Sequence, residues 1–171
     1  MNAHTCLICC LLFVAAHHSH ALDLCKPHET TVFSCKTSKT KSVSVCASKN
    51  LASHRASSYV VYRFGSPTKI ELDITHKNPL SIGAPQLYHY FRSQVDRWSL
   101  AFQGKGAIYS VFSEYEGDFN PDKPQSSAGV HVNTGAKSVE IACVGPVKAR
   151  WHVVAGHVPC EDDDMNSCET P

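Results

Sequence analysis

Catalytic signature motifs are missing from this sequence of 171 residues. It contains no Gly-x-Ser-x-Gly elbow, no His-Glu-x-x-His pair, no phosphate-cradling glycine loop and no dinucleotide-binding fingerprint. Beyond residue 21 it also has no Cys-x-x-Cys pair, the spacing that structural zinc sites usually contain. These absences predict a protein that is not an enzyme and that uses no metal and no cofactor.

A long apolar run is also missing, since a helix that spans a bilayer needs about 20 apolar residues. Residues 7–16 form a shorter apolar run, which is followed by Ser19-His20-Ala21. Small residues at these places are typical of a secretory cleavage site. We therefore expect residues 1–21 to be a signal peptide and residues 22–171 to form a periplasmic or secreted protein without a membrane span.

The sequence has no excess of basic residues, because 16 lysines and arginines balance 15 aspartates and glutamates. Nucleic-acid-binding domains usually carry a clear basic excess, so we expect no nucleic-acid partner. The charges are nevertheless unevenly placed: residues 25–105 hold twelve basic and four acidic residues, and residues 106–171 hold four basic and ten acidic ones. The acidic run at 161–164 predicts a solvated C-terminal tail.

Cysteine is abundant, and six of the nine cysteines lie beyond residue 21. An even number of cysteines in an exported domain predicts a disulfide framework. From spacing alone we expect three bridges, which are Cys35 with Cys46, Cys143 with Cys160, and Cys25 with Cys168. A direct link from Cys25 to Cys35 is the main alternative.

Apolar and polar residues alternate with period two along most of the chain, which is the pattern of β-strands. Nine short strands are predicted, at residues 32–36, 42–47, 59–64, 69–74, 88–95, 97–102, 107–115, 129–133 and 137–143. A further short strand fits residues 149–153. Turn residues recur between these segments, so we expect one all-β domain, an antiparallel β-barrel or sandwich held by disulfides.

Two hairpins have a predicted register. In the first, a four-residue loop at 65–68 sets Tyr59 opposite Ile74. In the second, Gly104 comes first in a two-residue type II′ turn, a position that needs a positive φ. This register sets Leu100 opposite Tyr109 and predicts an apolar, core-facing side for the hairpin.

The turn Gly104-Lys105-Gly106 is the candidate partner-binding site, because a lysine between glycines on a tight turn projects outward. The adjoining segment Gly106-Ala107-Ile108-Tyr109 is similar to the Ser-Gly-x-x-Tyr signature of bacterial periplasmic lysozyme inhibitors. Lys105 stands where that family has serine, and the family's second motif, a tyrosine followed by Thr-Lys-Gly, is absent. The resemblance implies a β-barrel that inserts a loop into a lysozyme groove, with Gly104, Lys105, Gly106 and Tyr109 at the contact.

A core role for Tyr109 is the competing interpretation, since the predicted register turns its ring toward Leu100. Residues 32–35, 43–48 and 62–65 also resemble uncharacterised exported proteins of Gram-negative bacteria, a likeness that implies no known activity.

Two functions follow from these patterns. The first is an exported inhibitor or immunity-type protein that blocks a cell-wall hydrolase. Its expected partner is a protein, such as a peptidoglycan hydrolase. The alternative is a ligand-binding or structural β domain of the cell envelope, which the aromatic residues Tyr88, Tyr90, Phe91 and Trp98 favour.

Acidic residues at 114, 116, 118 and 122 allow a third interpretation. Paired carboxylates serve glycosidases and bind calcium. Alternating acids are also the pattern of a solvated strand face, which is the interpretation we favour. His152 and His157 are the closest histidine pair beyond residue 21, and their spacing matches no standard metal site.

Overall fold

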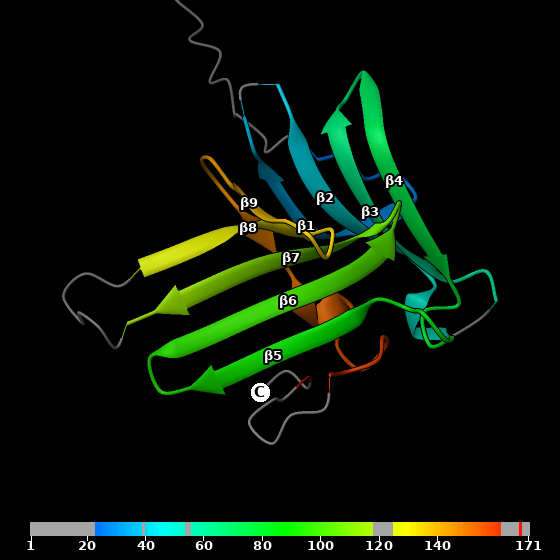
Figure 1. Cartoon of the computed structure of the whole chain (residues 1–171). Coiled ribbons are helices and arrows are strands. Elements are labelled where there is room, and N and C mark those ends of the chain that lie inside the picture. The colour runs from blue at the N-terminus through cyan, green and yellow to red at the C-terminus, as the bar shows by residue number, and fades with distance from the viewer. Residues whose placement is uncertain (1–22, 39, 54–55, 118–124, 162–167, 169–171) are drawn as a thin grey trace, which may run out of the picture.

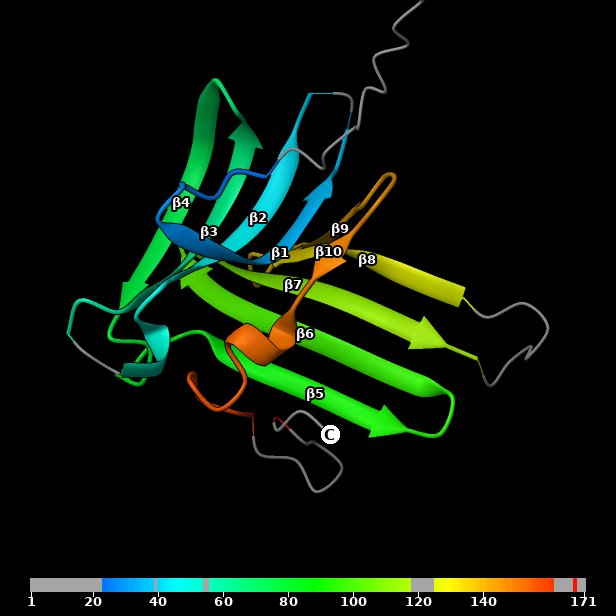
Figure 2. The same ribbon diagram turned by 180° about the vertical axis from the view of Figure 1, so that it is seen from behind.

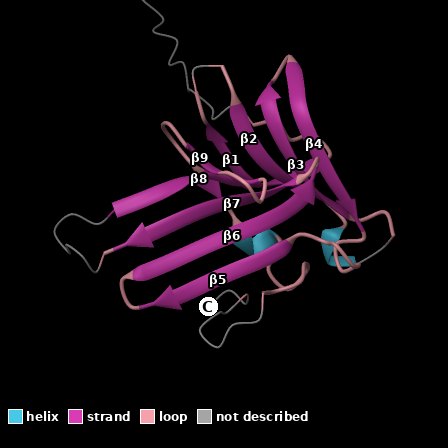
Figure 3. Cartoon of the chain, in the orientation of Figure 1, coloured by secondary structure: helices cyan, strands magenta, loops and turns pink. Residues whose placement is uncertain are grey.

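The computed structural model describes residues 23–38, 40–53, 56–117, 125–161 and 168. The expected signal peptide, Asp118, Asp122 and most of the acidic run at 161–164 lie outside the described residues. Within them, strands dominate, and the only helical elements are the 3₁₀ turns η1 (Leu51–Ser53) and η2 (Trp151–Val153) (Figure 3).

The strands form two antiparallel sheets of five strands each (Figure 1). Sheet A has the order β10-β1-β2-β3-β4, with bounds Lys148–Ala149, Glu29–Lys36, Ser42–Ser48, Tyr59–Ser66 and Lys69–Lys77. Sheet B has the order β5-β6-β7-β8-β9, with bounds Gln86–Arg92, Val95–Gly104, Ala107–Glu116, Gln125–Asn133 and Ser138–Ala142. The all-β prediction is confirmed, and of its two architectures the sandwich fits, since the sheets do not close into a barrel.

The core lies between the two sheets, whose strands cross steeply (Figures 1 and 2). Sheet A contributes fully buried Phe33, Val45 and Tyr62, and sheet B contributes Leu100 and Val111. These side chains share one face of each strand because successive strand residues point to opposite faces. The outer face of sheet B carries mostly polar residues and faces the viewer in Figure 1.

The predicted register of the β3–β4 hairpin is wrong. Tyr62, not Tyr59, lies opposite Ile74, and β3 continues to Ser66, so that only two residues remain in the turn. The pairing shifts at Gly65, whose φ of 147° is a conformation that favours glycine. A side chain there would run into the backbone of Lys69, so glycine is required at this irregularity.

The segment predicted as a strand at 149–153 is mostly a turn. Only Lys148–Ala149 pairs with β1, and the 3₁₀ turn η2 follows. The turn places the Trp151 ring in the core, where it stacks on Phe33 with the ring centroids 5.6 Å apart.

All six cysteines of the described chain form disulfides, but none of the predicted pairs is correct. The bridges are Cys25–Cys46, Cys35–Cys143 and Cys160–Cys168. Cys35 and Cys46 cannot meet, because Cys35 lies opposite Val43 in the core and Cys46 lies on the outer face, opposite Thr31. The alternative pairing of Cys25 with Cys35 fails for the same reason, since Cys25 lies on the outer face of sheet A.

Cys143 and Cys160 are separated by the path of the chain. The Val144 amide donates to the Lys36 carbonyl at 2.7 Å, which carries Cys143 to the end of β1 and its partner Cys35. Cys160 lies instead beside β5, in a bridge pairing with Leu87, and bonds to Cys168.

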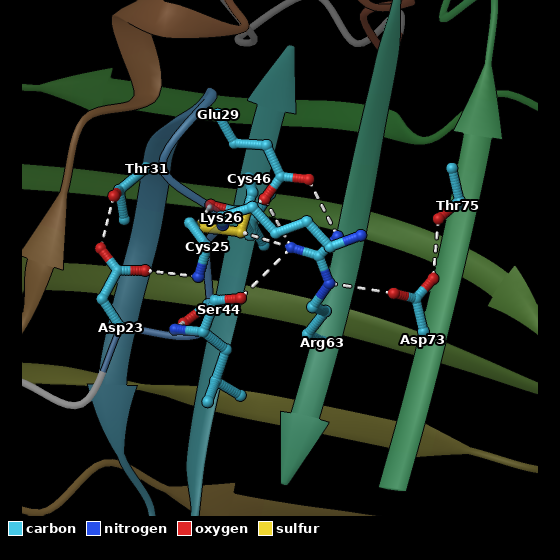
Figure 4. Close-up of polar contacts among 12 residues, drawn as sticks. Asp23, Cys25, Lys26, Glu29, Thr31, Ser44, Cys46, Arg63, Asp73 and Thr75 are labelled. Carbon is cyan, nitrogen blue, oxygen red and sulfur yellow. Dashed lines mark hydrogen bonds and ion pairs between the residues drawn. A yellow bond between two sulfur atoms is a disulfide. The ribbon is translucent and has the colours of Figure 1, made fainter. Parts of the chain in front are cut away.

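Residues 23–28 form an N-terminal strap over the outer face of sheet A (Figure 4). The Leu24 amide donates to the Ser44 hydroxyl at 3.0 Å, and the Leu24 carbonyl accepts from Arg63 at 3.2 Å. The Cys25–Cys46 disulfide ties the strap covalently to β2. The strap therefore buries polar groups that a bare outer face would leave in water.

A buried ion pair lies beneath the strap. Arg63 and Glu29 form two parallel hydrogen bonds of 2.6 and 2.9 Å, and the Arg63 Nε donates to Asp73 at 2.9 Å. The Arg63 side chain is 4% exposed and the Glu29 side chain is fully buried. Burial by itself raises the pKa of Glu29, but hydrogen bonds from Arg63, the Lys26 amide and Tyr59 outweigh it and lower the pKa to about 2. The charged pair is therefore part of the folded state.

This ion pair predicts acid-sensitive stability. A carboxyl whose pKa is lowered by folding stabilises the protein above its unfolded pKa of about 4.3, and this stabilisation is lost as the pH falls toward 2. The loss should be about 3 kcal/mol in the free energy of unfolding. Glu29→Gln should lower stability at neutral pH by about 3 kcal/mol and flatten the acid limb, as measured by urea unfolding from pH 2 to 7.

Glu71→Gln is the matched control, because Glu71 forms only an exposed ion pair with Lys41. It should leave both the neutral stability and the acid limb unchanged. An acid limb in Glu29→Gln as steep as that of the wild type would contradict this role for Glu29.

Candidate functional site

The β6–β7 turn consists of Lys105 and Gly106, and Gly104 pairs with Ala107 to close it. Both turn residues have positive φ, 53° and 76°, which defines a type I′ turn in place of the predicted type II′. The predicted register is therefore wrong by two residues: Phe102, not Leu100, lies opposite Tyr109. An even shift keeps each side chain on its predicted face.

Gly104 fits the turn against sheet A. A Cβ atom at this position would lie 2.9 Å from the Cδ1 atom of Ile74, which belongs to β4. The end of the hairpin therefore packs closely beside β4, as Figures 1 and 2 both show. Lys105 and Gly106 remain exposed on this supported base.

Tyr109 faces the core. Its ring lies 5.3 Å from the ring of Tyr62, between the centroids, and it is half-buried opposite Phe102. Its neighbour Ile108 points the other way, to the outer face of sheet B, and is 39% exposed. The exposed surface next to the turn thus presents Ile108, a residue that the sequence motif contained without assigning it a role.

Two hollows flank Ile108. One, of about 680 Å³, lies between the β6–β7 turn and the β8–β9 turn and includes Asn133 and Gly135. The other, of about 390 Å³, is bounded by the loop that carries Ile82, whose side chain is fully exposed. We call Lys105, Ile108, Ile82 and these two hollows the turn surface.

The β8–β9 turn beside Lys105 is held in place by its own side chains. The Gly135 amide donates to the Asn133 side chain at 2.7 Å, and the Lys137 amide donates to the Thr134 hydroxyl at 3.2 Å. Such side-chain bonds stabilise a turn without a partner strand. The two adjoining turns therefore form a preorganised edge of sheet B.

The other sequence candidates are not brought together. Glu116 accepts hydrogen bonds from Arg97, and Glu114 contacts the Ser127 hydroxyl at 3.5 Å. In the described part of the chain, the single group of potential metal ligands is Asp23 with Cys25 and Cys46. Both cysteines are in a disulfide, so they offer no thiolate to a metal.

Comparison with known proteins identifies no relative: no family model, no curated protein and no solved structure matches this chain. Among the described residues, no helix is long and apolar enough to cross a membrane. The resemblance of residues 106–109 to periplasmic lysozyme inhibitors therefore stays a prediction from the sequence.

These positions predict different effects on stability for Tyr109 and Lys105. Tyr109→Ala removes a ring that packs on the core and should lower the free energy of unfolding by about 2–3 kcal/mol. Lys105→Ala should change the free energy of unfolding by less than about 0.5 kcal/mol, because the Lys105 side chain is exposed in the turn. Tyr109→Phe keeps the ring and serves as the control. Thermal and urea unfolding measure all three, and an equal loss in Lys105→Ala and Tyr109→Ala would refute this placement.

Proposed function

We propose that this protein is an exported inhibitor or immunity-type protein that binds a cell-wall hydrolase through the turn surface. The observation that carries the proposal is Lys105, an exposed ammonium on a two-residue turn that pairs with no acidic group in the described chain. Three disulfides in a small domain support export, because such bridges persist in oxidising compartments.

The chemistry of the proposed partner complements this turn. Glycoside hydrolases that cut the cell wall use a pair of carboxyl groups in a groove. A lysine on a two-residue turn reaches such a groove without unfolding any strand. The turn is also fixed before binding, so little conformational entropy is lost on association.

Apolar contacts beside the lysine would supply the remaining binding energy. Ile108 and Ile82 are exposed on the two sides of the smaller hollow. Isolated exposed apolar residues are ordinary, but these two border the same hollow. The turn surface therefore combines one positive charge with an apolar flank, an arrangement suited to the rim and mouth of an acidic cleft.

The test is inhibition of purified hydrolases. The oxidised protein should inhibit peptidoglycan hydrolysis by at least one member of a panel of lysozymes and lytic transglycosylases. Lys105→Ala should weaken this inhibition about 30-fold, the effect of losing a desolvated charge contact. Lys69→Ala is the matched control, because Lys69 is an exposed lysine beside the β3–β4 turn.

Ile108→Ser extends the test to the apolar flank and should weaken inhibition by about tenfold. The proposal fails if no hydrolase of the panel is inhibited. It also fails if Lys105→Ala inhibits as strongly as Lys69→Ala.

A further inference from the structure

A second candidate site lies on the inner face of sheet B, where its strands extend beyond sheet A (Figure 2). A groove of about 470 Å³ is present there, which we call the inner groove. Asp96, Ser113, Tyr115 and Ser126 line its floor, and Val147 and Ala149 line the wall that the chain forms around β10. Its volume falls within the range of about 300–1,000 Å³ that is usual for small-molecule sites.

The wall of the inner groove is fixed to both sheets. The Cys35–Cys143 disulfide holds its start, and the Cys143 amide donates to the Ala128 carbonyl at 2.8 Å. At its other end, the Arg150 amide donates to the Val32 carbonyl at 2.7 Å. The groove is therefore preformed, which lowers the cost of binding a ligand.

Asp96 is oriented by a buried histidine. His89 is 2% exposed, and its Nε2 atom lies 3.0 Å from the Asp96 carboxylate. The imidazole also stacks on Trp98, with the ring centroids 3.5 Å apart. The Asp96 side chain is nevertheless 43% exposed, so its carboxylate is held in place and still accessible from the groove.

Ser113 is oriented by a buried tryptophan. The Trp151 Nε1 atom donates to the Ser113 hydroxyl oxygen at 2.8 Å. Because the oxygen accepts this bond, the hydroxyl hydrogen of Ser113 is left to donate elsewhere. A buried ring thus orients a hydroxyl donor on the floor of the groove, as His89 orients the acceptor Asp96.

The charges of the lining select the ligand. One carboxylate, from Asp96, lies in the inner groove, and no lysine, arginine or histidine lines it. This carboxylate repels an anion and attracts a cation. Three hydroxyl groups, from Ser113, Tyr115 and Ser126, add donors and acceptors for a hydroxylated ligand.

We propose that the inner groove binds a small, hydroxylated organic cation of the size of an amino sugar. The ammonium group lies at Asp96, the hydroxyl groups bond to the floor, and the apolar side of the ligand packs against Val147 and Ala149. The inner groove and the turn surface share no residue, so this proposal stands or falls independently of hydrolase inhibition.

Tryptophan fluorescence gives a direct readout, because the two tryptophans of the chain, Trp98 and Trp151, both adjoin the inner groove. Glucosamine, titrated at a pH where its amine is protonated, should change the emission saturably. N-acetylglucosamine has the same ring without the charge and should bind at least about fivefold more weakly. Added salt should weaken the binding of glucosamine.

Asp96→Asn should weaken the binding of glucosamine about fivefold. Glu140→Gln is the matched control, because Glu140 is exposed on β9 and does not line the groove. Should Asp96→Asn fail to fold without its bond to His89, the comparison of glucosamine with N-acetylglucosamine decides. No saturable change, equal affinity for N-acetylglucosamine, or wild-type affinity in a folded Asp96→Asn would overturn the proposal.

Discussion

The Cys35–Cys143 disulfide is the constraint on which the arrangement of the two sheets depends. It joins the inner face of β1 to the chain that leaves β9, across a sequence separation of 108 residues. Nearly the whole sandwich lies within the loop that it closes. In the chain-entropy model, a loop of this length corresponds to a stabilisation of about 4–5 kcal/mol. The bridge therefore restricts the conformations that the unfolded chain can adopt.

The C-terminal segment takes its path from this bridge. From Cys143 the chain passes β10 and delivers Trp151 into a row of stacked rings, between Phe33 of sheet A and Trp98 of sheet B. The ring centroids of Trp98 and Trp151 lie 6.3 Å apart with nearly parallel planes. The same segment forms the wall of the inner groove, so the crosslink, the aromatic core and this candidate site form one unit.

Local signals in the sequence predicted the strands but not their pairing partners in space. Alternation located β2 and β7 within a residue or two, and the glycines located the turn at Lys105. Alternation does not predict irregularities in strand pairing. The register shift between Thr31 and Phe33 and the one at Gly65 leave no signal in the alternation of apolar and polar residues. For this reason the disulfide pairs, which depend on the faces of Cys35 and Cys46, were not predictable.

The same distinction between local and long-range signals applies to the candidate sites. Lys105 was predictable because its whole turn is local in the sequence. Ile82 and the inner groove were not, because their neighbours come from separate strands and meet only in the folded sandwich. The Arg63–Glu29 pair joins residues 34 positions apart and equally leaves no signal in local patterns.

The most direct test of the account is to map the disulfides by proteolysis without reduction, followed by mass spectrometry of the linked peptides. The account predicts peptides that join Cys35 to Cys143, Cys25 to Cys46 and Cys160 to Cys168, whereas a peptide that joins Cys35 to Cys46 would contradict it.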